Sequence, residues 1–262
     1  MDIWLAILSI LPSLLIAAFL FVKDKSREPG AYLILAFILG MVSIIPAWLL
    51  EQLWHNYAPL SDDSLAGTLV FAFIGIALME EVPKFLFLRI GFYPRTFFDE
   101  PLDGIVYAGM IGMGFAMVEN LLYAVEHGMG TTILRAFTAV PAHAVFAVLM
   151  GYYMGLAKFD RDNHALLMRK SLLWAVLIHG LYDFFLIQNF VPGLIGLAIL
   201  VLYISIYFSM RLIRMHQAVS NRYAVPVVLL QETPSAQNPL PPPVDEGLVD
   251  EIIRDMQEDK EI

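Results

Sequence analysis

The stretch IALMEEVPKFLFL, residues 76–88, places two adjacent carboxylates and a lysine inside an otherwise apolar run. It lies within a longer apolar segment, residues 66–90, which is long enough to cross roughly 30 Å of hydrocarbon as a helix. An ionised side chain at the centre of such a helix costs about 2.5–3.5 kcal/mol on insertion scales. Glu80, Glu81 and Lys84 are therefore expected to have a role that offsets this cost.

The composition of the whole chain agrees with a membrane location. Hydrophobic residues make up 59% of the chain, charged residues 16%, and the mean hydropathy is +0.69. A soluble domain of this size would be about half apolar and about one quarter charged. The apolar runs do not alternate with polar residues, which argues against a transmembrane β-barrel. The composition therefore predicts an integral membrane protein built from helices.

The apolar runs predict an all-α fold, a polytopic transmembrane helix bundle of about seven spans. The first run has neither a basic segment before it nor a small-residue cleavage site, so we expect a retained helix rather than a signal peptide. The expected spans are residues 3–22, 31–50, 66–90, 104–125, 132–157, 171–188 and 193–212.

Lysine and arginine predict how the bundle is oriented. They occur in the loops after the first, third and fifth spans and at the end of the seventh, whereas the N-terminus and the other three loops have none. Because such residues are enriched in cytoplasmic loops, we expect the N-terminus outside and the C-terminus in the cytoplasm.

The C-terminal part differs in composition from the rest of the chain. We expect a transmembrane helical domain over residues 1–214 and a Pro-rich, acidic, mostly disordered cytoplasmic tail over residues 215–262. Apolar residues at helical spacing near the end, Leu248 to Met256, are interpreted as a solvated segment, with a partner-docking helix as the alternative. The absence of cysteine excludes disulfides and thiolate chemistry.

Ionisable residues within the apolar spans fall on four consecutive segments. Counting about 1.5 Å per residue puts the glutamates and histidines roughly 12–20 Å from the cytoplasmic edge, near the middle of the bilayer. Similar depth on neighbouring helices predicts that these side chains surround one site. The ionisable residues of the four segments are Glu80, Glu81, Lys84, Glu119, His143, His179 and Asp183, with Arg135 nearer the outer end of its span.

The spacing within each segment predicts local pairs. Glu80 and Lys84 are one helical turn apart, so an acid–base pair can form, while Glu81 is rotated by about 100° toward another partner. Asp183 stands four residues after His179 and can hold its imidazole in one tautomer, which would leave the other ring nitrogen free. Pro83 removes a backbone hydrogen bond, and loosening there could admit water.

Each of these residues also has a structural interpretation. Glu80 and Lys84 could form an ion pair with no catalytic role, and His143 could be an interhelical hydrogen-bonding residue. For Arg135, near the outer end of its span, snorkelling toward water is the favoured interpretation, and Phe115 is interpreted as packing. Small residues every four positions from Gly104 predict close approach of a neighbouring helix, which would turn Glu119 toward the bundle.

Four motifs in order resemble those of a known family. EEVPK fits E-E-x-x-K, FAMVE fits F-x-x-x-E and HGLYD fits H-x-x-x-D, with PAHAVFAVLMGY between the last two. The chain resembles the PrsW family of bacterial membrane proteases over roughly residues 66–190. That family is grouped with the type II CAAX prenyl endopeptidases and, more distantly, with the APH-1 subunit of γ-secretase.

The resemblance implies an intramembrane endopeptidase that uses glutamate-activated water. By position it assigns catalysis to Glu80, Glu81, Glu119, His143 and His179, and we add supporting roles for Lys84, Asn120 and Asp183. Glu80 is the expected general base because Lys84 shares its face, with Glu81 as the alternative. The resemblance leaves metal use open. If a divalent metal such as zinc is bound, its expected ligands are Glu119, His143 and His179.

The resemblance also implies a substrate and a location. We expect a membrane-anchored protein of the anti-sigma-factor type as the substrate, a multi-pass location in the inner membrane of a bacterial cell, and no nucleic-acid partner. Two other functions stay open at this point. One is a non-catalytic scaffold or sensor related to APH-1, and the other is a proton-coupled transporter, since glutamate and histidine chains also relay protons. The lack of a visible internal repeat counts against a transporter.

Overall fold

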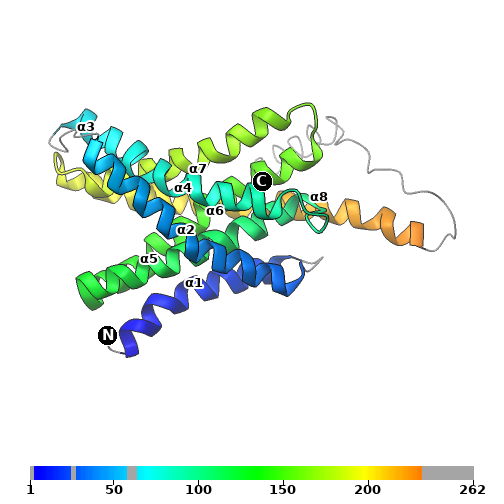
Figure 1. Ribbon diagram of the computed structural model, residues 1–262, viewed down its shortest axis with the longest axis horizontal. Helices are drawn as coiled ribbons and strands as arrows, with labels where there is room; N and C mark the ends of the chain where they lie inside the picture. The colour runs from blue at the N-terminus through cyan, green and yellow to red at the C-terminus, as the bar shows by residue number, and fades with distance from the viewer. Residues whose placement is uncertain (1–2, 25–27, 58–63, 232–262) are drawn as a thin grey trace, which may run out of the picture.

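The computed structural model describes residues 3–24, 28–57 and 64–231, with side chains up to residue 218. In these residues the regular structure is entirely helical, and seven helical stretches are long and apolar enough to cross a membrane. The expected all-α bundle of seven spans is confirmed (Figure 1). The orientation of the termini relative to a membrane stays a prediction.

The helices follow one another with short connections. Their bounds are α1 (Ile3–Lys23), α2 (Gly30–Tyr57), α3 (Leu65–Val70), η1 (Phe71–Leu78), α4 (Met79–Phe87), η2 (Leu88–Phe92), α5 (Pro101–Phe137), α6 (Ala139–Phe159), α7 (His164–Ile187), η3 (Pro192–Leu194) and α8 (Ile195–Gln231). The four elements from α3 to η2 together form the third span, Leu65–Phe92.

The third span changes its helical geometry just before the paired glutamates. Residues Phe71–Leu78 form a π-helix, and the α-helix resumes at Met79. Such wide turns are often found beside functional sites, because they rotate the following residues around the helix axis. Pro83 lies inside α4 and has no N–H to donate to the carbonyl of Met79, but the helix continues through it.

Helix α5 is the central element of the bundle. Every residue from Pro101 to Ala116 is buried, and the helix packs against α1, α2 and α6. A helix that is apolar and buried all round needs small residues wherever neighbouring backbones come close. The glycines of α5 meet this requirement on more than one face.

Two glycine contacts show how closely the helices approach. A Cβ atom built on Gly104 would lie 2.3 Å from the carbonyl oxygen of Gly151 in α6, and one built on Gly151 would lie 2.2 Å from the carbonyl oxygen of Gly104. On another face of α5, a Cβ atom on Gly114 would lie 2.0 Å from the carbonyl oxygen of Phe37 in α2. The neighbour that approaches the predicted small-residue stripe is therefore α6.

The connection between α5 and α6 differs from the expected loop at residues 126–131. Gly128 has φ 73° and ψ −165°, a conformation available mainly to glycine, and helical turns continue on both sides of it. A second break follows at Thr138 (φ −122°, ψ −72°), three residues before Pro141, which has no N–H to donate to the carbonyl of Phe137. Residues 129–137 therefore form a separate helical segment, which carries Arg135.

Two other boundaries differ from the sequence-based expectation. Helix α2 continues past the expected end at residue 50 to Tyr57, so Glu51 belongs to a helix. The expected domain boundary at residue 215 lies within α8, which runs to Gln231. Residues 232–262, including the apolar stripe near the C-terminus, lie outside the described residues, and the proposed tail domain stays a prediction.

Buried acids fix the start of α5. Asp103 accepts hydrogen bonds through Oδ2 from the backbone N–H groups of Asp99 (2.7 Å) and Glu100 (2.8 Å), which caps the helix. One turn later Tyr107 donates to Glu28, in the connection between α1 and α2. Burial raises the pKa of Glu28 above its usual value. These contacts join the α1–α2 connection to the central helix.

The contact between α5 and α6 generates a test of the packing. Replacing Gly104 by alanine places a methyl group against backbone atoms that cannot move aside, so we expect a loss of about 1–3 kcal/mol in stability. The midpoint of thermal unfolding in detergent, followed by the fluorescence of the four tryptophans, measures this loss. In the control variant Gly196→Ala, the new methyl group meets no atom within 4 Å, and the midpoint should stay near that of the parent protein. An equal midpoint for the Gly104 variant would contradict the close packing.

Candidate active site

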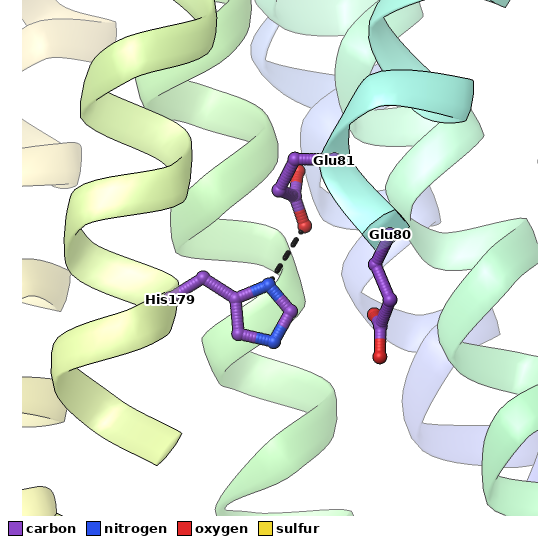
Figure 2. Close-up of side chains that lie close together, drawn as sticks. All are labelled: Glu80, Glu81 and His179. Atoms are coloured by element: carbon purple, nitrogen blue, oxygen red, sulfur yellow. Dashed lines mark hydrogen bonds and ion pairs between the residues drawn. The ribbon is translucent and has the colours of Figure 1, made fainter. Parts of the chain in front are cut away.

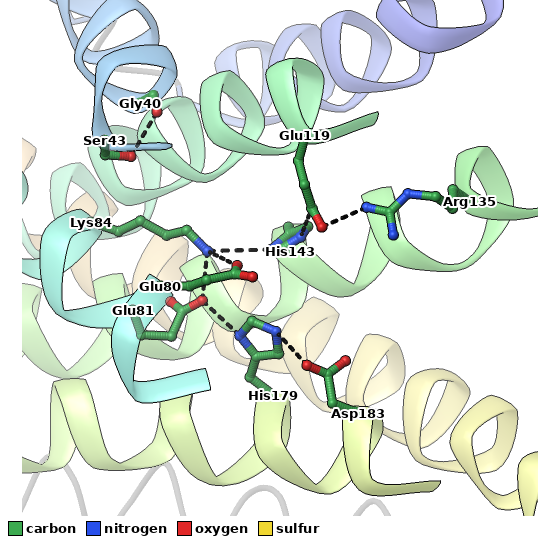
Figure 3. Close-up of polar contacts among 10 residues, drawn as sticks. All are labelled: Gly40, Ser43, Glu80, Glu81, Lys84, Glu119, Arg135, His143, His179 and Asp183. Atoms are coloured by element: carbon green, nitrogen blue, oxygen red, sulfur yellow. Dashed lines mark hydrogen bonds and ion pairs between the residues drawn. The ribbon is translucent and has the colours of Figure 1, made fainter. Parts of the chain in front are cut away.

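The five residues predicted to be catalytic lie together between four helices. Glu80 and Glu81 come from α4, Glu119 from α5, His143 from α6 and His179 from α7 (Figure 3). Four of them are almost completely buried, with exposed fractions between 1% and 6%, and the side chain of Glu119 is 15% exposed. The expected convergence of four polar segments is present in the structure.

Lys84 lies at the centre of this group. Its Nζ is 2.8 Å from Glu81 Oε1, 3.2 Å from Glu80 Oε2 and 3.4 Å from His143 Nδ1. The sequence predicted a pair with Glu80, but the shorter contact is with Glu81. The ammonium also lies 3.7 Å from the centre of the Phe115 ring, so Phe115 makes a cation–π contact as well as packing.

His179 contacts a carboxylate through each ring nitrogen. Its Nδ1 lies 3.0 Å from Glu81 Oε1 (Figure 2), and its Nε2 lies 3.2 Å from Asp183 Oδ2. The expectation that Asp183 would leave the other nitrogen free was wrong, because Glu81 occupies it. Both hydrogen bonds can form together when the ring carries two protons, or when one carboxyl group carries a proton.

The contacts of His143 define its tautomer. The Lys84 ammonium can only donate, so Nδ1 must be the acceptor in their contact. The proton of a neutral His143 then resides on Nε2, which lies 2.7 Å from Glu119 Oε2 and donates to it. His143 therefore links the Lys84 group on α4 to Glu119 on α5.

The second oxygen of Glu119 has a different partner. Arg135 Nη2 lies 2.8 Å from Glu119 Oε1, and the guanidinium lies 3.8 Å from the centre of the Tyr123 ring. Only 15% of the Arg135 side chain is exposed. The expected snorkelling toward water is wrong, because the side chain points into the bundle and pairs with a residue of the site (Figure 3).

Asn120, to which the sequence gave a supporting role, lies on another face of α5. Its Nδ2 donates a 3.1 Å hydrogen bond to the backbone oxygen of Ser9 in α1. The structure therefore gives Asn120 a contact between helices and does not bring it to the catalytic group.

Sequence reasoning missed one acid, Glu51. It lies in the extension of α2, and the charged groups that interact with it electrostatically include Glu119, Lys84 and His179. The signal was its position directly after the apolar run that ends at residue 50.

The site holds more negative than positive side chains. Four carboxylates, those of Glu80, Glu81, Glu119 and Asp183, meet two cationic side chains, those of Lys84 and Arg135. With both histidines neutral, two formal negative charges remain in a buried place, where an unbalanced charge is costly. Protons or a divalent cation can offset them.

The donor atoms of the site fit such a cation. Ligand atoms lie within 4.8 Å of one another in the group Glu80, Glu81 and His179, and likewise in the group Glu80, Glu119 and His143. Carboxylate oxygens and imidazole nitrogens are ordinary zinc ligands, and Glu81 Oε2 is buried without a hydrogen-bond partner. The ligand set expected from the sequence divides between the two groups, and Glu80, which was not in that set, belongs to both.

The structure shows the site in a closed form. The space lined by Glu81, Lys84, His143 and the small residues Gly112 and Ala147 is too small to hold a water molecule. The polar side chains fill it by contacting one another. Access of water and of a peptide therefore requires these side chains to separate.

The comparison with known proteins agrees with the resemblance of the four motifs to the PrsW family. The model of the PrsW family intramembrane metalloprotease matches residues 28–210. A relative from Oceanobacillus iheyensis, named Protease PrsW, is 36% identical over 184 residues, which cover 70% of this chain and 83% of the relative. Proteins of the same name are 31% identical in Geobacillus kaustophilus, covering 84% of this chain and 95% of the relative, and 34% identical in Bacillus subtilis, covering 68% and 80%.

No solved structure is significantly similar to the chain. The family match covers all four helices that carry the polar site, and the relatives align over most of their own length. The chain therefore belongs to the PrsW family of intramembrane metalloproteases.

Proposed function

We propose that this membrane-embedded peptidase hydrolyses a peptide bond of a membrane-anchored protein with a water molecule activated by Glu80. The observation that carries the proposal is the single buried network in which Lys84 joins Glu80, Glu81 and His143, while His179 extends it to Asp183. It combines the groups that peptide hydrolysis requires: a carboxylate base, a proton donor and a positive charge.

Glu80 is the better candidate for the general base. Glu81 uses one oxygen for both Lys84 (2.8 Å) and His179 (3.0 Å), so its carboxylate is held firmly in place. Glu80 has the longer contact with Lys84, at 3.2 Å, and no hydrogen bond joins it to His179, whereas Glu81 has one (Figure 2). A carboxylate with fewer fixed partners is freer to accept a proton from water.

The remaining groups supply the other parts of the reaction. As water attacks the carbonyl carbon, its proton passes to Glu80, and the developing oxyanion is stabilised by the Lys84 ammonium. The carbon–nitrogen bond then breaks as the amine takes a proton from His179, which requires one of the two carboxylate contacts of its ring to open. Asp183 and Glu81, one on each ring nitrogen, stabilise the protonated form of His179 from which this proton comes.

A divalent metal would be held by Glu80 together with either Glu81 and His179 or Glu119 and His143. With Glu80, Glu119 and His143 as ligands, Glu81, the alternative base, would accept the proton from water. When bound there, zinc supplies a Lewis acid that polarises the scissile carbonyl. The family description as metalloproteases and the two unbalanced negative charges of the site both support its use.

For the substrate we propose a membrane-anchored regulatory protein of the anti-sigma-factor type, cleaved in the inner membrane of a bacterial cell. Three observations support this: the site lies between helices that span the membrane, the family members named above are bacterial, and the family consists of intramembrane proteases. A substrate with one transmembrane helix could reach the site from within the lipid.

The first prediction concerns the paired glutamates. The double variant Glu80→Gln, Glu81→Gln should cleave a single-span peptide in liposomes at least about 10²-fold more slowly, because neither of the paired carboxylates remains to accept the proton from water. Mass spectrometry of the products measures the rate. The matched control is Glu126→Gln, an exposed glutamate outside the site, which should cleave at the parental rate. Parental activity of the double variant would refute the proposed mechanism.

A second prediction concerns Asp183. The variant Asp183→Asn cannot stabilise a protonated His179, so kcat should fall about 10- to 100-fold, as is usual for a residue that supports an active group. The exposed Asp162, between α6 and α7, provides the control Asp162→Asn, for which kcat should not change. If the two variants had equal kcat values, His179 would not be the proton donor.

The third prediction concerns metal content. Purified protein that is equilibrated with zinc and then desalted should retain zinc, as measured by elemental mass spectrometry. Treatment with a chelator should remove both the zinc and the proteolytic activity. The variant Glu80→Gln should retain less zinc, since Glu80 belongs to both ligand groups, whereas Glu126→Gln should retain the parental amount. Full activity of the zinc-free, chelator-treated protein would instead show that glutamate-activated water acts alone.

A further inference from the structure

We infer that Arg135 is a positioning residue for the hydrolysis, which acts by fixing the carboxylate of Glu119. This inference rests on the proposed function and adds a residue that lies outside the four motifs. Arg135 Nη2 contacts Glu119 Oε1 at 2.8 Å, and the residues are 16 positions apart in the chain, on opposite sides of the break at Gly128. The pair therefore exists only because the chain folds back after that glycine.

The two oxygens of Glu119 have one partner each. Oε1 faces Arg135, and Oε2 lies 2.7 Å from His143 Nε2. A carboxylate held at both oxygens cannot rotate about its last side-chain bond, so the direction of its contact with His143 is fixed. His143 in turn touches Lys84, at the centre of the site. Arg135 thus controls the geometry of the site through Glu119, without itself reaching the paired glutamates.

Arg135 is itself held in place. Its guanidinium lies 3.8 Å from the centre of the Tyr123 ring, one turn after Glu119 on α5, and the flat face of an arginine suits such a contact. Arg135 Nε is buried without a hydrogen-bond partner among the described residues. The position of the guanidinium thus leaves one of its N–H donors, that of Nε, without a partner in the described part of the chain. Its position is explained by the contacts with Glu119 and Tyr123.

The charges predict the consequence of removing the guanidinium. Glu119 would keep only His143 as a direct partner, with the Lys84 ammonium as the other nearby cation. Any movement of Glu119 toward that ammonium, or of the ammonium toward Glu119, changes the contacts that Lys84 makes with Glu80 and Glu81. We therefore expect a defect in the chemical step, with little change in how the substrate binds.

The kinetic test uses full-length protein in liposomes with a single-span peptide. In Arg135→Ala, kcat should fall about 10- to 100-fold, the range typical of residues that orient an active group. KM should stay within about threefold, because the lost contact does not hold the substrate. Arg135→Lys should recover part of the loss, since it returns the charge without the planar fork. An unchanged kcat in Arg135→Ala, or a raised KM with unchanged kcat, would overturn the inference.

The control variant is Arg89→Ala. Arg89 also lies against a tyrosine ring, at 4.6 Å from the centre of Tyr93, but it is far along the chain from Glu119 and contacts none of the residues of the site. It should keep the parental kcat. If Arg135→Ala and Arg135→Lys lost activity and unfolded at equally lowered temperatures, Arg135 would be a structural residue, and the inference would fail.

A second measurement does not depend on proteolysis and separates the failure of this inference from that of the proposed function. Arg135→Ala in the parental protein leaves Glu119 without its cation, so the substitution should lower the midpoint of thermal unfolding. The same substitution in the Glu119→Gln variant removes no ion pair and should lower the midpoint much less. If the parental protein cleaved no peptide but the two shifts of the midpoint differed, the proposed function would be refuted, while the interaction of Arg135 with Glu119 would be supported. Equal shifts in both backgrounds would show that Arg135 does not act on Glu119.

Discussion

The contacts of one buried ammonium organise the site. Lys84 meets Glu80, Glu81 and His143 in a place where an unpaired charge is costly, because all four side chains are buried. Breaking such a pair by removing one partner leaves the other charge buried, which destabilises a protein more than the pair stabilised it. The helices α4 and α6 are therefore held together by the same atoms that the chemistry uses.

These contacts are possible only because α5 allows its neighbours to come close. The backbones of α5 and α6 touch at Gly104 and Gly151, and those of α5 and α2 touch at Gly114. A larger residue at any of these positions would place its Cβ atom 2.0–2.3 Å from a backbone oxygen, which the present separation of the helices does not allow. The apolar packing thus determines whether His143 reaches Lys84, although no glycine takes part in the reaction.

The closed form of the site has a consequence for catalysis. The space lined by Glu81, Lys84 and His143 is too small for a water molecule, so we expect side chains or a helix to move when water and a peptide enter. The third span is suited to such movement. It contains the π-helical residues Phe71–Leu78 and the interior Pro83, both of which weaken the regular pattern of backbone hydrogen bonds beside the paired glutamates.

The sequence by itself determined the class of fold and most of the site. Seven apolar runs are long enough to span a bilayer, and five polar residues at similar depth on four of them must face one another rather than lipid. Only the tertiary structure decided the partners. The fold after Gly128 turned Arg135 onto Glu119, the extension of α2 added Glu51, and the rotation of α5 sent Asn120 to Ser9. Helical spacing reports neighbours on one helix, whereas contacts such as that of His179 with Glu81 depend on how two helices are turned toward each other, which no local pattern records.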